Sequence, residues 1–245
     1  MDSLEFRKRV KKSSFVICVV LIIFIIFLML YKYEVEGENK EKLPFLIKSI
    51  SIVSTADGTN KEKTKDFLWT GKLIQTNDIY VNIKNNNSKK ILENVTIENI
   101  EIKKAPEIGT LIFSNISKNK DSSNLYLTEE SLEKLVYKAD TKSSLEKLTI
   151  ANNGGTVGLR IMNTNLGEYK TNVETINYDG RMLAINNIVN EKLKFNIHFD
   201  IVIKVKDDIE YYVTVNTELP KGNIVEKGTE LVEYKDIKNF VYKRK

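Results

Sequence analysis

The stretch FNIHFDIVIKV, residues 195–205, decides the class of fold. Its odd positions are all apolar, and its even positions are polar except for Val202. Side chains on a β-strand point alternately to its two faces, so this pattern indicates a long strand with one face on a core and one in water. The alternation resumes at Ile209 after Asp207-Asp208, which predicts an antiparallel hairpin.

Similar alternation recurs along most of the chain after residue 42. Further strands are expected over residues 43–55, 67–75, 78–85, 91–103, 109–116, 145–152, 156–163, 229–234 and 237–242. A second hairpin is expected where Asp179-Gly180 separates residues 173–178 from residues 181–185, because glycine accepts the positive φ of a tight turn. The Asp57-Gly58-Thr59-Asn60 segment is interpreted as a turn.

The expected strand over residues 91–103 contains an irregularity. Its apolar positions are odd at Val95 and Ile97 but even at Ile100 and Ile102. One extra residue near Glu98-Asn99 would return the apolar side chains to the same face. The sequence therefore predicts a β-bulge there.

One segment after residue 42 has helical spacing. Thr128 or Ser131 can cap it, and Leu132, Leu135, Val136 and Ala139 follow at intervals of three or four. We therefore expect an all-β ectodomain built as an antiparallel β-sandwich. It divides into two immunoglobulin-like sandwich modules, residues 34–127 and 143–245, with a short linking helix in residues 128–142. One larger sandwich is the alternative.

The N-terminal part is a candidate membrane anchor. Phe15 to Leu30 are all apolar, and residues 13–31 carry no charge, a length near the roughly 17–20 residues that a bilayer-spanning helix needs. Five basic residues precede the run within residues 1–12, whereas acidic residues dilute the lysines after it. The positive-inside bias predicts a cytoplasmic tail (1–12), a transmembrane signal-anchor (13–33) and an extracytoplasmic C-terminal domain. No small-residue cleavage site follows the run.

Charge and cysteine content exclude some functions. The chain carries 38 basic and 33 acidic residues, but residues 1–31 hold five basic and two acidic ones. The remainder is nearly neutral, which argues against a nucleic-acid partner. The single cysteine, Cys18, lies in the apolar run, so the outer domain has no disulfide and no cysteine nucleophile. The abundance of Ile, Asn and Lys is typical of an AT-rich bacterial genome.

No motif predicts catalysis. Ser131 with Lys134, and Ser144 with Lys147, match the S-x-x-K spacing of Ser–Lys hydrolases, but the other motifs of those enzymes are absent. The single histidine, His198, lies on the polar face of its strand, and Trp69 is interpreted as a core or half-buried strand residue. We therefore predict no catalytic residue, no cofactor site and no metal site.

These observations lead to an expected function of limited detail. We expect a non-enzymatic binding or scaffolding protein of the bacterial cell envelope, held in the lipid bilayer by residues 13–33. Its partner would be an envelope protein or a wall polymer. The alternatives are a regulatory subunit of a membrane complex and, less favoured, an envelope hydrolase using Ser131 and Lys134.

Overall fold

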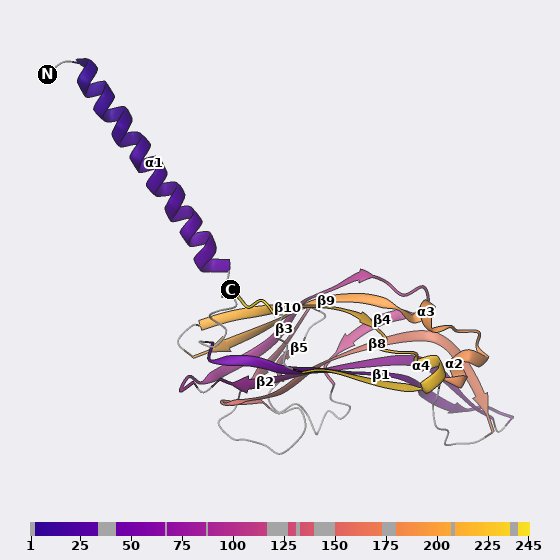
Figure 1. Ribbon diagram of the computed structural model, residues 1–245. Coiled ribbons are helices and arrows are strands. Elements are labelled where there is room, and N and C mark those ends of the chain that lie inside the picture. The colour runs from indigo at the N-terminus through magenta and orange to yellow at the C-terminus, as the bar shows by residue number, and fades with distance from the viewer. Residues whose placement is uncertain are drawn as a thin grey trace.

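The computed structural model describes residues 3–33, 43–66, 68–86, 88–116, 127–130, 133–139, 150–172, 180–206, 209–235 and 240–245. The described chain consists of one long N-terminal helix and a β-rich body made of two sheets (Figure 1). All strand pairs in both sheets are antiparallel.

The N-terminal helix α1 (Ser3–Tyr33) projects away from one end of the β-rich body (Figure 1). The side chains of residues 14–29 are all exposed, although this stretch is apolar from Phe15 onward. The C-terminal end of α1 lies beside the last strand of the chain, β12 (Lys243–Arg244). Within the part of the chain that the structure describes, no helix has both the length and the apolar character needed to cross a membrane.

The first sheet contains the longest strands. Its order is β11-β1-β2-β8-β4, and β7 also pairs with β8. The strands are β11 (Thr229–Lys235), β1 (Phe45–Lys63), β2 (Trp69–Asn85), β8 (Gly154–Thr171), β4 (Thr110–Ser114) and β7 (Ile150–Ala151).

The second sheet packs against the first. Its order is β12-β10-β9-β3-β6-β5. In addition to β12 it contains β10 (Ile209–Leu219), β9 (Phe195–Val205), β3 (Leu92–Lys104), β6 (Lys134–Lys138) and β5 (Leu127–Glu130). Three short helices, α2 (Arg181–Ile185), α3 (Asn190–Leu193) and α4 (Ile224–Lys227), lie at the end of the body opposite α1 (Figure 1).

The topology differs from the expected pair of separate modules. Each sheet combines strands from residues 34–127 with strands from residues 143–245. In the first sheet β1 pairs with both β2 and β11, and in the second β3 pairs with β9. The strands of the two halves are therefore interleaved around one main core.

The alternating pattern of residues 195–205 is confirmed. All six odd positions of β9 are buried, and β9 pairs with β10 in register as the expected hairpin. These side chains meet those of the first sheet, including the fully buried Phe45, Ile79 and Leu159, in one continuous apolar core. Burial of this apolar surface is the main stabilising contribution to the sandwich.

The β-bulge in β3 is confirmed. The pairing register of β3 with β9 shifts between Glu98 and Glu101, and Asn99 adopts a positive φ of 53°. The Asn99 amide donates to the Asp200 carboxylate at 2.8 Å, and Thr214 donates to the same carboxylate at 2.6 Å. The bulge thus keeps the apolar face of β3 on the core and fixes a nearly buried carboxylate on the opposite face.

The prediction of a short helix in residues 128–142 is wrong for the residues that are described there. Residues 127–130 and 134–138 form strands β5 and β6, and β6 pairs with β3. Leu135 and Tyr137 are buried while Val136 between them is half-buried, which is a two-residue period. The apolar residues also suit a helix by their spacing, but cross-strand pairing on a buried face determines the structure here. Ser131 lies outside the described residues.

Two turn predictions are also wrong. Asp57 to Asn60 lie inside β1, where Asp57 pairs with Ile74 of β2, so that β1 and β2 form one long hairpin. Residues 181–185, expected as a strand, form α2, and Gly180 precedes it with φ of −58°. A Cβ on Gly180 would come within 1.8 Å of the Val225 carbonyl oxygen, so glycine is required for close packing and not for a turn. Residues 173–179 lie outside the described residues.

Two buried tyrosines connect the sheets near α1. The Tyr211 hydroxyl donates to the Phe45 carbonyl at 2.8 Å and accepts from the Phe45 amide at 3.1 Å. The Tyr242 hydroxyl accepts from the Ile47 amide at 2.9 Å, and the two rings pack edge to face. Burial raises the pKa of both phenols, that of Tyr242 to about 12.

We therefore expect stability to fall at alkaline pH. A folded-state pKa above the unfolded value of about 10 gives a contribution that is complete below pH 10 and is lost as pH rises toward 12. Tyr242→Phe should make this fall less steep and, at neutral pH, cost about 1–3 kcal/mol through the unpaired Ile47 amide. Denaturant titrations across the pH range measure both effects. A variant whose profile superimposes on that of the wild type would contradict the assignment.

Candidate interaction surface opposite the N-terminal helix

Of the four S-x-x-K residues that the sequence singled out, the structure describes Lys134. Lys134 is the first residue of strand β6. Ser131, Ser144 and Lys147 lie outside the described residues. Among the residues that are described, no group of three or more His, Cys, Asp or Glu side chains could hold a metal ion.

His198 and Trp69 are surface residues of the strands. The His198 ring nitrogen Nδ1 lies 2.8 Å from the Asn216 side-chain oxygen, across the outer face of β9 and β10. Trp69 is half-buried at the start of β2, and Lys63 Nζ lies 5.8 Å from its ring centroid. Both arrangements are contacts within the hairpins, and neither places a nucleophile beside a base.

A charged pair that the sequence did not reveal lies on the outer face of the first sheet. Arg160 of β8 donates to both carboxylate oxygens of Asp78 of β2, at 2.7 and 2.6 Å. Arg160 is only 9% exposed. The bond to Asp78 raises the pKa of Arg160, and burial raises that of the neighbouring Tyr80. This geometry holds two central strands together and offers no reactive group.

The end of the body opposite α1 has its own small core. Its buried residues come from β1, β2, β8 and the three short helices, and we call this region the cap. They are Ala56, Leu73, Leu166, Tyr169, Leu183, Ile188, Leu193 and Ile224.

A layer of buried polar side chains lies between the cap and the main core. Along β1 the layer residue is Ser54, between Ile52 of the main core and Ala56 of the cap. On β2, Asn77 is opposite Ser54 and Gln75 is opposite Ala56, and Gln75 is also opposite Asn163 of β8. Within the described part of the chain, neither amide atom of Gln75 has a hydrogen-bond partner. Burying polar side chains costs free energy unless they are hydrogen-bonded.

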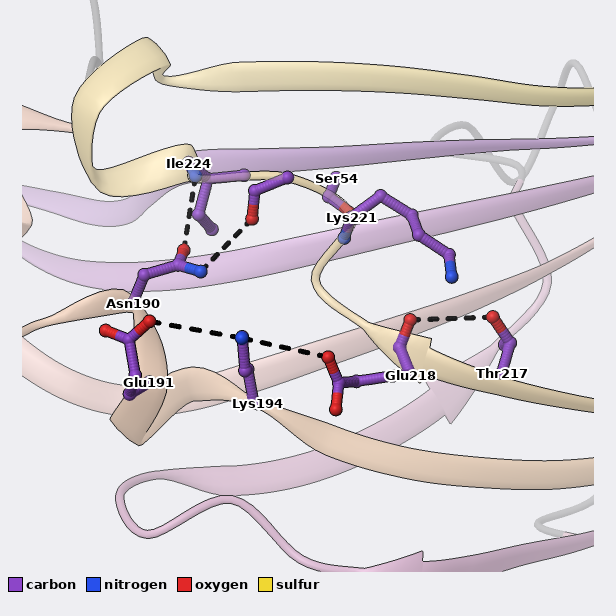
Figure 2. A network of polar contacts seen from close by, with 9 residues as sticks. Ser54, Asn190, Glu191, Lys194, Thr217, Glu218, Lys221 and Ile224 are labelled. Atoms are coloured by element: carbon purple, nitrogen blue, oxygen red, sulfur yellow. Dashed lines mark hydrogen bonds and ion pairs between the residues drawn. The ribbon is translucent and has the colours of Figure 1, made fainter.

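Hydrogen bonds of buried side chains hold the cap helices in place (Figure 2). Asn190 of α3 donates to the Gly222 carbonyl at 3.1 Å and accepts from the Ile224 amide at 3.2 Å. The Ser54 hydroxyl accepts from the Lys221 amide at 2.8 Å and donates to Asn77. The connection into α4 is thus fixed to both α3 and β1.

Ion pairs border the same connection. Lys194 lies 3.9 Å from Glu191 of α3 and 3.8 Å from Glu218 of β10 (Figure 2). Partly exposed pairs at this separation contribute little stability, about 0–1 kcal/mol each.

The outer surface of the cap exposes apolar side chains. Ile185 at the end of α2 is 75% exposed, and Val189 just before α3 is 49% exposed. Asn187 between them has a positive φ of 57° and is exposed. We call Ile185, Asn187 and Val189 the cap patch.

Comparison with known proteins gives no information about the role of this surface. The chain matches no protein-family profile, no curated protein and no solved structure. The cap patch was not predicted from the sequence either, because a short apolar run such as residues 182–185 suits both a strand and a short helix.

Asn190→Ala should open the cap without unfolding the sandwich. The change removes both bonds of a buried amide and leaves the Ile224 amide unpaired, which costs about 1–3 kcal/mol. Hydrogen exchange in α2, α3 and α4 should then become about five- to a hundredfold faster, while that of β9 and β10 stays unchanged. Asn186→Ala is the control, because its amide bonds only to Met182 within α2. Equal acceleration in β9 would contradict a separate cap.

Proposed function

We propose that this chain is a single-pass membrane protein of the bacterial cell envelope. Its N-terminal helix anchors a β-sandwich outside the cytoplasm, and the sandwich binds another envelope component without catalysing a reaction. The observation that carries the proposal is α1: its described apolar side chains are all exposed, and it projects away from the sandwich (Figure 1). A helix whose apolar side chains are exposed is unfavourable in water and favourable in lipid.

The length and flanks of α1 support the anchor. The helix runs from Ser3 to Tyr33. The uncharged run in its sequence covers residues 13–31, and the side chains that the structure describes are those of residues 14–29. At about 1.5 Å per residue, this run matches the roughly 30 Å hydrocarbon core. The basic residues before it favour a cytoplasmic N-terminus.

The position of the cap patch supports a binding role for the outer domain. The cap lies at the end of the body farthest from α1, where a partner in the envelope can reach it (Figure 1). Two exposed apolar side chains beside a polar asparagine match the mixed character of small protein contacts.

Site-specific photocrosslinking in native membranes tests the binding role. A photoreactive residue at Ile185 should form one discrete adduct, and Val189→Asp in the same chain should abolish it. The matched control is Ile112, an exposed isoleucine in β4 on the side of the body, which should give no such adduct. Adducts that are identical from both positions, or unaffected by Val189→Asp, would reject the cap patch as the binding surface.

A further inference from the structure

We propose that the end of the sandwich beside α1 lies on the membrane surface and binds anionic lipid headgroups. This inference rests on the proposed function, in which α1 crosses the bilayer. The occupant follows from position and charge: this end adjoins the anchor, and its exposed loops are rich in lysine.

Three segments far apart in sequence form this end. The Lys206 amide donates to the Ile91 carbonyl at 2.9 Å, which joins the β9–β10 hairpin to the loop between β2 and β3. The Lys245 amide donates to the Glu210 carbonyl at 3.1 Å, which joins the C-terminus to the other arm of the hairpin. The end is therefore a continuous row of loops across the second sheet.

This row is predominantly basic among its described residues. The exposed basic side chains are Lys89, Lys90, Lys206, Arg244 and Lys245. Lys245 pairs with Glu98, and the carboxylate of Glu93 is held by Lys204 at 2.9 Å. The sequence also puts Asp207 and Asp208 beside Lys206. Lysine and arginine near an anionic membrane surface are attracted to it, over a range limited by the Debye length.

Exposed isoleucines lie among these charges. Ile91, just before β3, is 38% exposed, and Ile209, the first residue of β10, is 39% exposed. Their backbones are neighbours, because Lys206 bonds to Ile91 and Val205 is opposite both Leu92 and Ile209. Apolar side chains within a basic surface suit the boundary between headgroups and acyl chains. There the apolar side chains enter the interface while the charged groups remain in water.

The proximity of the anchor makes this contact geometrically available. The C-terminal end of α1 lies beside β12, whose residues end the same row. With Tyr31 and Tyr33 at the bilayer interface, as aromatic residues prefer, the row lies at headgroup level. The sandwich is thus fixed to the membrane by two attachments, the helix and the basic row.

Fluorescence quenching with the full-length chain in nanodiscs tests the contact. The native Cys18 is changed to serine, and an environment-sensitive fluorophore is attached through Ile91→Cys or Ile209→Cys. Nanodiscs contain phosphatidylcholine alone or phosphatidylcholine with phosphatidylglycerol, each with a nitroxide on a fraction of the headgroups. Both positions should be quenched more strongly with phosphatidylglycerol, and about 1 M salt, where the Debye length is about 3 Å, should remove most of the difference.

Variants at both ends of the sandwich provide the controls. Lys89→Glu with Lys90→Glu should remove the phosphatidylglycerol dependence, whereas Lys72→Glu with Lys170→Glu, exposed lysines near the opposite end, should not. A fluorophore at Ile185→Cys, in the cap, should remain unquenched in every nanodisc. Asp207→Asn with Asp208→Asn should increase quenching at position 91.

A further probe separates the two proposals. A fluorophore at Phe24→Cys should be quenched by a nitroxide on the acyl chains if α1 crosses the bilayer. Quenching at position 24 with no headgroup quenching at 91 and 209 would overturn the lipid contact and leave the anchor standing. Absence of quenching at position 24 would overturn the anchor itself.

Discussion

Asp78→Ala should lower the free energy of unfolding by about 3–5 kcal/mol, because it leaves the Arg160 guanidinium buried without its partner. The two side chains are 10% and 13% exposed and share two short hydrogen bonds between the central strands β2 and β8. Denaturant unfolding of the variant and the wild type at neutral pH measures the difference. Arg160→Met combined with Asp78→Leu should recover most of the loss, because no buried charge is then left unpaired.

An exposed pair in the same sheet provides the control for this prediction. Glu233 and Lys235 of β11 form an ion pair at 3.0 Å, but both side chains are well exposed. Glu233→Ala should therefore change the free energy of unfolding by only about 0–1 kcal/mol. Equal effects of Asp78→Ala and Glu233→Ala would show that burial of the Arg160 pair has no energetic consequence.

Ile22→Lys combined with Ile23→Lys should release the protein from the membrane fraction. Both positions lie near the middle of the uncharged run, where each lysine costs about 2.5–3.5 kcal/mol of insertion free energy. The expected result is a shift of most of the chain from carbonate-resistant membranes to the soluble fraction or to degradation. Immunoblots of fractionated cells measure it.

The paired control keeps the apolar character of the helix. Ile22→Leu with Ile23→Leu should stay in the carbonate-resistant membrane fraction, since leucine inserts as readily as isoleucine. If the lysine variant remained in that fraction to the same extent, α1 would not be the element that holds the protein there.

The sequence predicted the local features of this fold where one physical signal dominated. The two-residue period of residues 195–205 identified β9, its core face and its hairpin with β10. The change of parity near Asn99 located the bulge, because a shift of one residue would otherwise turn the apolar face toward water.

Other features depend on contacts that are distant in sequence. The spacing from Leu132 to Ala139 suits a helix, yet Leu135 and Tyr137 are buried in a strand that pairs with β3. The short stretch 181–185 forms a helix, and the preceding Gly180 packs on the backbone of α4, far along the chain. Pairing of Ser49 with Lys235 likewise joins the first strand to a late one, which no local pattern indicates.

The candidate surfaces were less predictable than the strands. The Asp78–Arg160 pair joins two strands that are adjacent only in the folded sheet, so the sequence shows two unrelated charges. The cap patch consists of apolar residues beside asparagines. Many loops have this composition, so the sequence does not distinguish the patch from an ordinary loop. The basic row was not predicted from the sequence, because its basic residues come from three separate segments.

Thiol accessibility in intact cells tests the topology on which the proposed function depends. In a Cys18→Ser chain, Ser3→Cys places one thiol before the anchor and Ile185→Cys places one in the cap. A membrane-impermeant maleimide should label the thiol at position 185 in intact cells, and the thiol at position 3 only after the membrane is permeabilised. Labelling of position 3 in intact cells, or protection of position 185, would contradict a membrane-anchored sandwich outside the cytoplasm.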